Sequence, residues 1–512
     1  MTISRRAFLA QSSVFTLLPG TLLAGTVFPG CGSGESPEEA FSAGPRPNPA
    51  SPRPLDNKPF GSQPPVPGTP SGSDLIFNRR ILGRDPYKVS TDIRAMVQEA
   101  ADTGRPLRVL AGGHGYLGSA TIKDGLVIDM RNRRQVTFDL SQRQVTVEAG
   151  TRFVDFYRAL LRQYGNLDLI IPTGSCPTVG MSGYTLGGGF GHLSRRFGLM
   201  CDNVVAMTVV FVRTDGTVEE KVLTSNSGGE DAELFWGLRG AGGAHFAVVK
   251  DFTFQLRERP RNLRLHDLRL RNNMSADEIQ RVITIWLQWM NQHLDNKSIA
   301  SKLAVGSWWL HISGAHEDAG PLWDLRNQLQ FALAPAYPQW ELDYTMENVT
   351  RTFKGCDSLD ACEREPKKAF AARSAFLQKD DLPGRAWAIA QAAVARRSCP
   401  DYGGIELMGW RMNSGGVHMD NAFVHRNNDY ICQFYAEGME DESAPWMMSM
   451  FRAVTAREDN DETLPGYQNY SDARIQGVET GFPKVYFAGP GMGSSTVERL
   501  ERLRGRYRPL FG

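Results

Sequence analysis

Apolar residues recur at regular spacing along most of the chain, and the period changes from one segment to the next. Over residues 91–103, Ile93, Val97 and Ala100 share one face of a helix. Gly104 stands where this helix is expected to stop. The pattern therefore predicts that the folded part of the chain opens with an amphipathic helix.

Short strand-like runs follow this helix. Strands are predicted over residues 107–110, 126–130, 144–148, 204–213 and 246–256, and a second helix over 152–164. Polar turns separate these elements, and the order of helices and strands is mixed. The chain from 75 to 259 is therefore predicted to form one α+β body.

Longer elements alternate in the next part of the chain. Helices are predicted over residues 275–294, 320–331 and 382–397, and strands over 301–312, 404–412 and 430–437. These elements predict a second body over 260–462, and residues 463–512 are expected to return to the first one. Most of the ten tryptophans fall in the second body, including Trp308, Trp309, Trp340, Trp387 and Trp410. Each either fills the core or lines a substrate cleft, where its ring can stack on a sugar or polyketide ring.

The N-terminus has the pattern of a targeting segment. Ser4-Arg5-Arg6-Ala7-Phe8-Leu9 is a twin-arginine sequence, and an apolar run of small residues follows it as far as Val27. The alternative is a membrane anchor with a chance pair of arginines, but polar residues, Pro19 and Gly20 interrupt the run. Residues 1–31 are thus predicted to be a twin-arginine export signal.

Two features accompany this signal. Gly30-Cys31 matches only the last two residues of a lipoprotein cleavage box, so lipidation of Cys31 stays open as an alternative. Residues 32–74 consist largely of Pro, Gly, Ser and Ala and cannot bury enough apolar surface to offset the entropy of ordering. They are predicted to be a flexible linker between the export signal and the folded body. The protein is accordingly expected in the periplasm, at the cell surface or outside the cell.

Composition and charge exclude several classes of function. The net charge is +1, so no general attraction to nucleic acid or to an anionic membrane is expected. Seven cysteines are present, and a local bridge between Cys356 and Cys362 is compatible with an exported protein, although spacing does not establish the pairing. The chain has no CxxC pair and no HExxH motif, so no metal site is expected.

Two glycine loops carry the residues of greatest chemical interest. The first is Ala111-Gly112-Gly113-His114-Gly115-Tyr116-Leu117-Gly118, and the second is Gly174-Ser175-Cys176-Pro177-Thr178-Val179-Gly180. Glycines on both sides of His114 allow positive φ and let backbone N–H groups approach an anion such as a pyrophosphate. His114 could equally be a hydrogen-bonded loop residue, and Cys176 an inert thiol, although Gly and Pro flanks present the thiol rather than bury it.

A third glycine-rich run, Met181-Ser182-Gly183-Tyr184-Thr185-Leu186-Gly187-Gly188-Gly189-Phe190-Gly191, follows the second loop. So many glycines predict neither a helix nor an ordinary strand, and they favour close contact with a large flat ligand. Gly240-Ala241-Gly242-Gly243 is similar to a dinucleotide-binding phosphate loop. That motif requires a strand before it and a helix after it, whereas here a strand-like run follows, so this interpretation fails.

Together these motifs resemble the berberine-bridge-enzyme-like flavoproteins of the vanillyl alcohol oxidase superfamily, which have a PCMH-type FAD-binding domain. The resemblance rests on Gly113-His114, on Cys176-Pro177-Thr178-Val179-Gly180 and on Gly187-Gly188-Gly189-Phe190-Gly191. It continues through Ser194–Leu199, Asp202-Asn203-Val204, Ala422-Phe423-Val424-His425-Arg426 and Asn469-Tyr470-Ser471-Asp472. It implies an α+β fold with a two-part FAD-binding domain and an α/β substrate domain, in which helices back an antiparallel sheet.

The resemblance also implies how the cofactor is held. His114 would bond to the 8α-methyl carbon of FAD and Cys176 to carbon 6, so that the flavin is attached at two points. The further residues expected to bind it are Gly112, Gly113, Gly115, Tyr116, Gly118, Gly174, Thr178, Val179, Gly180, Gly183, Gly188 and Val248. The chain departs from the family at Ala244-His245-Phe246-Ala247 and at Tyr486-Phe487-Ala488-Gly489, which puts some flavin contacts in doubt.

The implied reaction is hydride transfer from a substrate carbon to flavin N5, while a base removes the hydroxyl proton. Tyr470 matches the family's catalytic tyrosine, with Gln433 and Tyr467 as further active-site residues. An unperturbed tyrosine has a pKa of about 10, so Tyr470 would need a nearby positive charge or hydrogen-bond donors to act as a base near neutrality. The alternative is a core tyrosine whose hydroxyl is hydrogen-bonded.

The electron acceptor and the substrate follow from the same resemblance. Val179 matches a position where valine is associated with oxidases, which favours O2 as acceptor and H2O2 as product. The substrate is expected to be a bulky oligosaccharide or secondary metabolite, oxidised at an alcohol or hemiacetal carbon. The alternatives are a dehydrogenase that passes electrons to a quinone or other carrier, and a flavin-loaded binding protein with little turnover.

Overall fold

The computed structural model of the chain describes residues 88–510. It leaves out 117–119, 121, 123–124, 243–245, 271–272, 308, 334–340, 346–347, 350, 353–369, 396, 398–402, 438–439, 458–463, 472–483, 489–494 and 509, as well as the side chains of 440–444. The predicted export signal with Cys31, the linker, Gly118 and the Cys356–Cys362 pair lie outside the described residues. No helix within the described part is both long and apolar enough to cross a membrane.

The first unit is built on two sheets. A parallel sheet has the strand order β1-β3-β2, and an antiparallel sheet has the order β4-β5-β9-β7-β8. In chain order the elements are β1 (Lys88–Ser90), α2 (Ile93–Thr103), β2 (Leu107–Leu110), β3 (Leu126–Asp129), β4 (Val136–Asp139), β5 (Gln144–Glu148), α3 (Phe153–Tyr164), β6 (Leu169–Ile170), α4 (Met181–Leu186), α5 (Ser194–Phe197), η3 (Met200–Asn203), β7 (Val204–Val212), β8 (Val218–Thr224), α6 (Gly229–Ala241), β9 (Val248–Gln255) and β10 (Arg257–Glu258).

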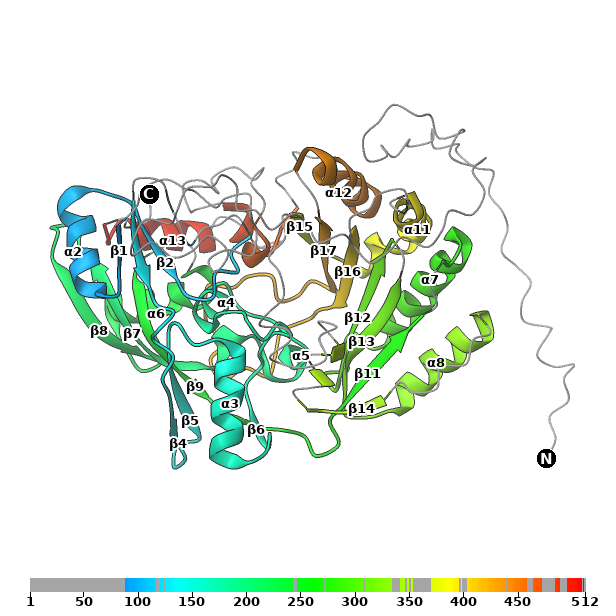
Figure 1. The fold of residues 1–512 in the computed structure, drawn as a ribbon, viewed down its shortest axis with the longest axis horizontal. Helices are drawn as coiled ribbons and strands as arrows, with labels where there is room; N and C mark the ends of the chain where they lie inside the picture. The colour runs from blue at the N-terminus through cyan, green and yellow to red at the C-terminus, as the bar shows by residue number, and fades with distance from the viewer. Residues whose placement is uncertain are drawn as a thin grey trace, which may run out of the picture.

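The second unit is a seven-stranded antiparallel sheet with the order β14-β11-β13-β12-β16-β17-β15. Figure 1 shows α7, α8, α11 and α12 on one face of this sheet, while its other face looks toward the first unit. The elements are β11 (Arg264–Arg269), α7 (Ala276–Gln292), β12 (Ile299–Gly306), β13 (Leu310–His316), α8 (Gly320–Leu333), β14 (Glu341–Asp343), β15 (Phe370–Leu377), η5 (Lys379–Asp381), η6 (Pro383–Arg385), α11 (Ala386–Ala395), β16 (Gly403–Gly409), β17 (Tyr430–Glu437) and α12 (Glu440–Thr455).

Alternation along the strands separates the two faces of this sheet. The helix-covered face carries apolar side chains that form one core with the helices, among them Leu303, Leu407 and Phe434. The opposite face, here called the inner face, carries Lys302, Glu406 and Gln433 at the alternate positions of the same strands. A sheet with one face on the core and one polar face is typical of antiparallel pairing.

The final elements lie against the first unit. They are η8 (Gln468–Tyr470), η9 (Lys484–Tyr486) and α13 (Ser495–Arg504), and Figure 1 shows α13 beside the first unit. Arg499 of α13 forms an ion pair with Glu233 of α6 at 2.7 Å. Farther on, Arg508 N donates to Val212 O, and Leu107 N donates to Leu510 O.

The predicted α+β class is confirmed, and so are most of the predicted elements. The helix predicted over 91–103 is α2, capped by Asp92 and ended by Gly104 with a φ of 68°. The strand predicted over 301–312 is wrong, because the chain turns between β12 and β13 and these two strands pair with each other. Gly306 N donates to Trp309 O across this turn, and the small glycine permits the tight reversal.

The expectation that residues 181–191 form no helix is also wrong for the first part of the run. Met181–Leu186 is the short helix α4, in which the Thr185 hydroxyl donates to Met181 O. Burial of Met181 and Thr185 outweighs the low helix propensity of the single internal glycine. Only the stretch from Gly187 to Gly191 is irregular.

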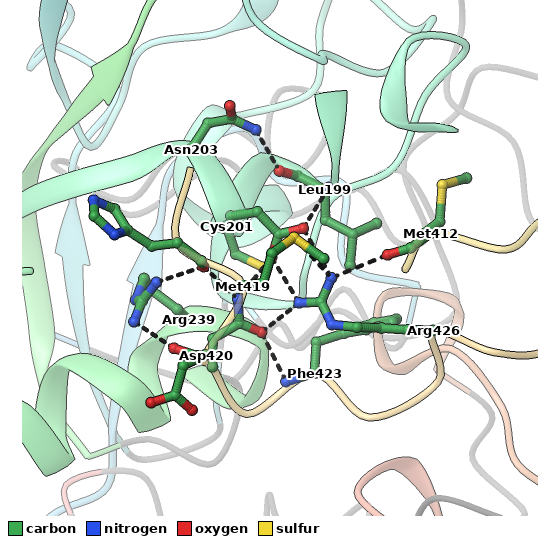
Figure 2. Close-up of polar contacts among 12 residues, drawn as sticks. Leu199, Cys201, Asn203, Arg239, Met412, Met419, Asp420, Phe423 and Arg426 are labelled. Atoms are coloured by element: carbon green, nitrogen blue, oxygen red, sulfur yellow. Dashed lines mark hydrogen bonds and ion pairs between the residues drawn. The ribbon is translucent and has the colours of Figure 1, made fainter. Parts of the chain in front are cut away.

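A buried ion pair joins the two units (Figure 2). Asp202 of η3 is fully buried and accepts two hydrogen bonds from the Arg426 guanidinium, at 2.6 and 2.8 Å. Leu199 N and the Asn421 amide complete the hydrogen bonds to this carboxylate. Arg239 of α6 donates to the carbonyls of His418 and Asp420, and Figure 2 shows Arg239 beside Asp420. The loop between β16 and β17 is therefore fixed onto the first unit by paired charges and by the backbone.

Candidate active site

The two glycine loops of the first unit cross each other at their backbones. A Cβ on Gly112 would lie 2.7 Å from the Cα of Gly180, and a Cβ on Gly180 would lie 2.9 Å from the Cα of Gly112. Neither position has room for a side chain, because the obstacle on each side is main chain rather than a flexible side chain. The two glycines are therefore required for the loops to meet.

The crossing brings both His114 and Cys176 into contact with one hydroxyl group. His114 Nε2 lies 3.0 Å from Thr178 Oγ1, and Cys176 Sγ lies 3.5 Å from the same oxygen. Thr178 is 9% exposed, so this hydroxyl is nearly buried. Two nucleophilic side chains that are far apart in sequence thus converge on one point.

The start of α3 holds the second loop in place. Phe153 N donates to Val179 O at 3.1 Å, and Val154 N donates to Pro177 O at 2.9 Å. These N–H groups belong to the first turn of a helix, where they have no partner inside the helix. The loop that carries Cys176 thereby satisfies the helix end and is itself fixed.

An aromatic group lies where the first unit meets the inner face of the second. Tyr116 and Tyr470 are stacked with ring centroids 5.3 Å apart, and Tyr467 meets Tyr470 edge-on at 5.2 Å. Gln433 of β17 donates to the Tyr116 hydroxyl at 2.6 Å. Burial is the largest cause that raises the pKa of the Tyr116 hydroxyl, and Glu406 and Cys176 raise it further. Tyr116 follows His114 by two residues in the first loop, so the aromatic group adjoins that loop. The structure therefore brings the expected catalytic residues and the expected attachment residues to one place.

The surroundings of Tyr470 hold its hydroxyl in the protonated form. Burial is the largest cause that raises its pKa above 10, and the neighbouring Tyr116 and the Glu406 carboxylate raise the pKa further. The positive charge that would favour a tyrosinate is not among the causes that act on Tyr470 within the described residues. Burial also raises the pKa of Tyr467, although Gly189 N–H and the Asn469 amide donate to its hydroxyl.

Glu406 is a site residue that the sequence patterns did not single out. In β16 it is the register partner of Gln433 in β17, so both side chains project from the inner face. Lys302 of β12 forms an ion pair with Glu406 at 2.8 Å. In the sequence, Gly404, Glu406 and Met408 alternate along β16 and so share one face of the strand. This pattern identifies Glu406 as a site residue only when the neighbouring strand is known to place Gln433 beside it.

The glycine run makes close contacts with protein groups. A Cβ on Gly188 would lie 2.7 Å from the Phe423 ring, and one on Gly189 would lie 2.5 Å from the Tyr184 ring. Both glycines also have positive φ, 108° and 77°. Among the described residues, packing against the second unit explains Gly188 and packing within the first unit explains Gly189, where the sequence favoured contact with a flat ligand.

The remaining expected cofactor residues are spread more widely. Gly183 on α4 has no heavy atom within 4 Å of a Cβ position, whereas Gly174 faces the rings of Tyr184 and Phe153. Val248 in β9 is buried in a core cluster with Val97 and Leu126. Flavin contacts of Gly113, Gly115, Gly174, Gly183, Gly188 and Val248 stay predictions.

Comparison with known proteins identifies the cofactor domain. The family model described as "FAD binding domain" matches residues 88–220. The chain is 37% identical over 192 residues to an aclacinomycin-N/aclacinomycin-A oxidase of Streptomyces galilaeus, covering 36% of this chain and 34% of that protein. It is 24% identical over 414 residues to the uncharacterized FAD-linked oxidoreductase YgaK of Bacillus subtilis, covering 79% and 83%.

Solved structures agree with this identification. A variant of berberine bridge enzyme matches with a TM-score of 0.70 and 18% identity over 86% of this chain and 92% of that one. The xylooligosaccharide oxidase from Myceliophthora thermophila matches with a TM-score of 0.68 and 20% identity, over 86% and 93%. The resemblance to berberine-bridge-enzyme-like FAD oxidoreductases is therefore confirmed. The matched stretch spans only about a third of the length of relatives such as the aclacinomycin oxidase.

The loop crossing generates a direct test. Gly112→Ala and Gly180→Ala are each expected to destabilise the protein by at least the ~1–3 kcal/mol typical of overpacking, because backbone must move. Both are also expected to lower the flavin content of the purified protein. The measurements are denaturant unfolding and the ratio of flavin to protein absorbance.

Gly228→Ala is the matched control for these two variants. Gly228 has an extended backbone with a φ of −115° and no atom within 4 Å of a Cβ position. Alanine fits there without a clash, and because Gly228 is the N-cap of α6, where alanine is less favoured than glycine, only a small loss of stability of under about 1 kcal/mol is expected, with wild-type flavin content. If Gly112→Ala has the same stability and the same flavin content as the wild type, the close crossing of the two loops is contradicted.

Proposed function

From the premise that this chain carries an FAD-binding domain within the fold of berberine bridge enzyme, we propose that it is an FAD-dependent oxidase with a doubly attached cofactor. Its substrate would be a bulky oligosaccharide or secondary metabolite, which the enzyme would oxidise at an alcohol or hemiacetal carbon. The observation that carries the proposal is the convergence of His114 and Cys176 on Thr178.

The residues present suit attachment to a single flavin ring. The 8α-methyl group is bonded to ring carbon 8, and one ring carbon separates carbon 8 from carbon 6, so two attaching atoms must approach the same edge of the ring. Two nucleophiles that both contact one hydroxyl suit this requirement. In the proposal, His114 bonds to the 8α-methyl carbon and Cys176 to carbon 6, and the crossing at Gly112 and Gly180 sets the spacing.

The chain's own residues would supply positioning and proton transfer. FAD held by His114 and Cys176 would supply the acceptor for a hydride from the substrate carbon, and the two electrons would leave with two protons on O2 as H2O2. Tyr470 is proposed to accept the proton of the substrate hydroxyl. Tyr116, stacked on Tyr470 and hydrogen-bonded to Gln433, would fix the orientation of Tyr470. Tyr467 is held by Gly189 N–H and Asn469, and it would support Tyr470 from the side.

Two further points belong to the same proposal. Val179 is proposed to leave access for O2, in keeping with the oxidase names of relatives such as the aclacinomycin and xylooligosaccharide oxidases. Residues 1–31 are proposed to direct export by the twin-arginine route, which carries proteins already folded with their cofactor. Replacing both Arg5 and Arg6 by lysine should leave the protein inside the cell, and unchanged export would contradict this route.

Attachment through both residues predicts a defined pattern of flavin loss. Denaturation in acid should leave flavin on the wild type and on His114→Ala and Cys176→Ala, because each single variant keeps one bond. The double variant should release it. Flavin fluorescence of the denatured protein in gels and the absorbance of the supernatant measure the two fractions.

The same wild-type preparation tests the oxidase activity. On a panel of sugars and glycosylated natural products, at least one compound should bleach the flavin and release H2O2 in air. A bleached flavin that needs a quinone for reoxidation would indicate a dehydrogenase. Flavin that no compound bleaches would contradict the proposed enzyme activity.

The pKa of Tyr470 gives a pH-dependent prediction. A raised pKa means that the tyrosinate form is gained only as the pH rises, so flavin reduction should accelerate toward alkaline pH. Glu406→Gln removes a negative charge that raises this pKa, so the acceleration should occur at lower pH. The measurement is the rate of anaerobic flavin reduction as a function of pH.

Glu258→Gln is the control, because Glu258 is an exposed carboxylate whose side chain is 69% accessible in the first unit. It should have the wild-type profile. If Glu406→Gln abolishes reduction at every pH, the carboxylate rather than Tyr470 accepts the proton, and the assignment of the base is wrong.

A further inference from the structure

A lateral row of side chains crosses the inner face of the second-unit sheet. In register, His311 of β13 lies opposite Ala304 of β12, Ala304 opposite Glu406 of β16, and Glu406 opposite Gln433 of β17. Register partners project from the same face, and adjacent strands are about 4.8 Å apart. The row therefore extends roughly 14 Å from Gln433, beside the tyrosines, to His311.

At the far end of the row, His311 and Asp267 form a hydrogen-bonded pair of polar side chains. His311 Nε2 lies 2.8 Å from Asp267 Oδ1, and Thr352 donates to the other carboxylate oxygen at 3.2 Å. Burial, the largest cause, lowers the pKa of His311 although Asp267 opposes it, so the imidazole is neutral at neutral pH. A neutral imidazole fixed by one nitrogen presents its other nitrogen, Nδ1, to a ligand as a hydrogen-bonding group.

An aromatic side chain lies beside this pair. A Cβ on Gly306 would lie 2.7 Å from Trp309 Nε1, so the indole rests against the glycine on the inner face. The Trp309 and His311 rings are 6.3 Å apart. Gly404 is the register partner of Gly306, and Ala304 separates His311 from Glu406, so only small side chains lie between these groups.

The charges along the row compensate one another. Lys302 pairs with Glu406, and Asp267 is engaged by His311 and by Arg269. An ionic ligand would need an excess of one sign, which these pairs do not provide. Neutral hydrogen-bonding groups beside an aromatic face suit a neutral ring that carries several hydroxyl groups.

The first unit limits the row on one side. Arg195 of α5 donates to Ile299 O at the start of β12, which places α5 over that end of the strand. Gly306 and Trp309 lie at the opposite end of β12, away from α5.

We propose that Trp309 and His311 form a distal subsite for a neutral sugar ring, so that the substrate is an oligosaccharide or glycoside of more than one ring. Its reacting end would lie at Tyr470 and Gln433, and a later ring would lie on Trp309 with its hydroxyls toward His311. This inference rests on the proposed oxidase site for the placement of the reacting end.

The test uses neutral xylo-, cello-, malto- and chito-oligosaccharides of one to four units. Calorimetric binding to the flavin-loaded protein should give at least one series in which three units bind about tenfold more tightly than one. His311→Ala and Trp309→Ala should each remove most of this gain, whereas Trp309→Phe, which keeps an aromatic face, should retain part of it. Trp323→Ala is the control, because Trp323 lies on α8 and is 45% exposed.

The outcomes separate this subsite from the oxidase. Affinity that does not grow with chain length in any series, or an equal loss for one and three units in both variants, overturns the subsite. Oligosaccharides that bind with this length dependence but never bleach the flavin support the subsite and contradict the oxidase. Oxidation of a natural product without any binding of sugars overturns the subsite and leaves the oxidase standing.

Discussion

The crossing of two backbones at Gly112 and Gly180 is the constraint on which the rest of the site depends. Because neither glycine has room for a Cβ, the loops after β2 and before α4 meet at a fixed distance. That distance brings His114 and Cys176 to Thr178. A cofactor bonded at both points would not need to be enclosed by the protein. The surrounding surface is then available for a large substrate.

The second unit completes the site, and buried charge holds it there. Asp202 is fully buried and the Arg426 side chain is only 13% exposed, and removing one partner of such a pair typically costs about 3–5 kcal/mol. The loop fixed by this pair also carries Phe423, which packs against Gly188. The inner face of the seven-stranded sheet is thereby held against the first unit. This placement lets Gln433 reach Tyr116. The row of inner-face side chains that ends at His311 therefore begins beside the tyrosines.

Local patterns predicted individual elements better than they predicted which distant elements meet. Periodicity and the stop at Gly104 were sufficient for α2, and the glycine flanks were sufficient to single out His114 and Cys176. The pairing of Gly112 with Gly180, the contact of both nucleophiles with the Thr178 hydroxyl, and Glu406 beside Gln433 depend on contacts between distant segments. Helix α4 was missed because burial of Met181 and Thr185 outweighs local propensity. Of the glycines after it, Gly188 serves packing between the units, and Gly189 serves packing against Tyr184 within the first unit.

Peptide mapping of the wild-type protein tests the central claim most directly. After digestion, mass spectrometry should detect one species in which the peptide with His114 and the peptide with Cys176 are joined through a single flavin. Its mass should equal the sum of both peptides and the flavin, less the hydrogens lost when the two bonds form. Recovery of both peptides unmodified, with all the flavin in free form, would contradict the account.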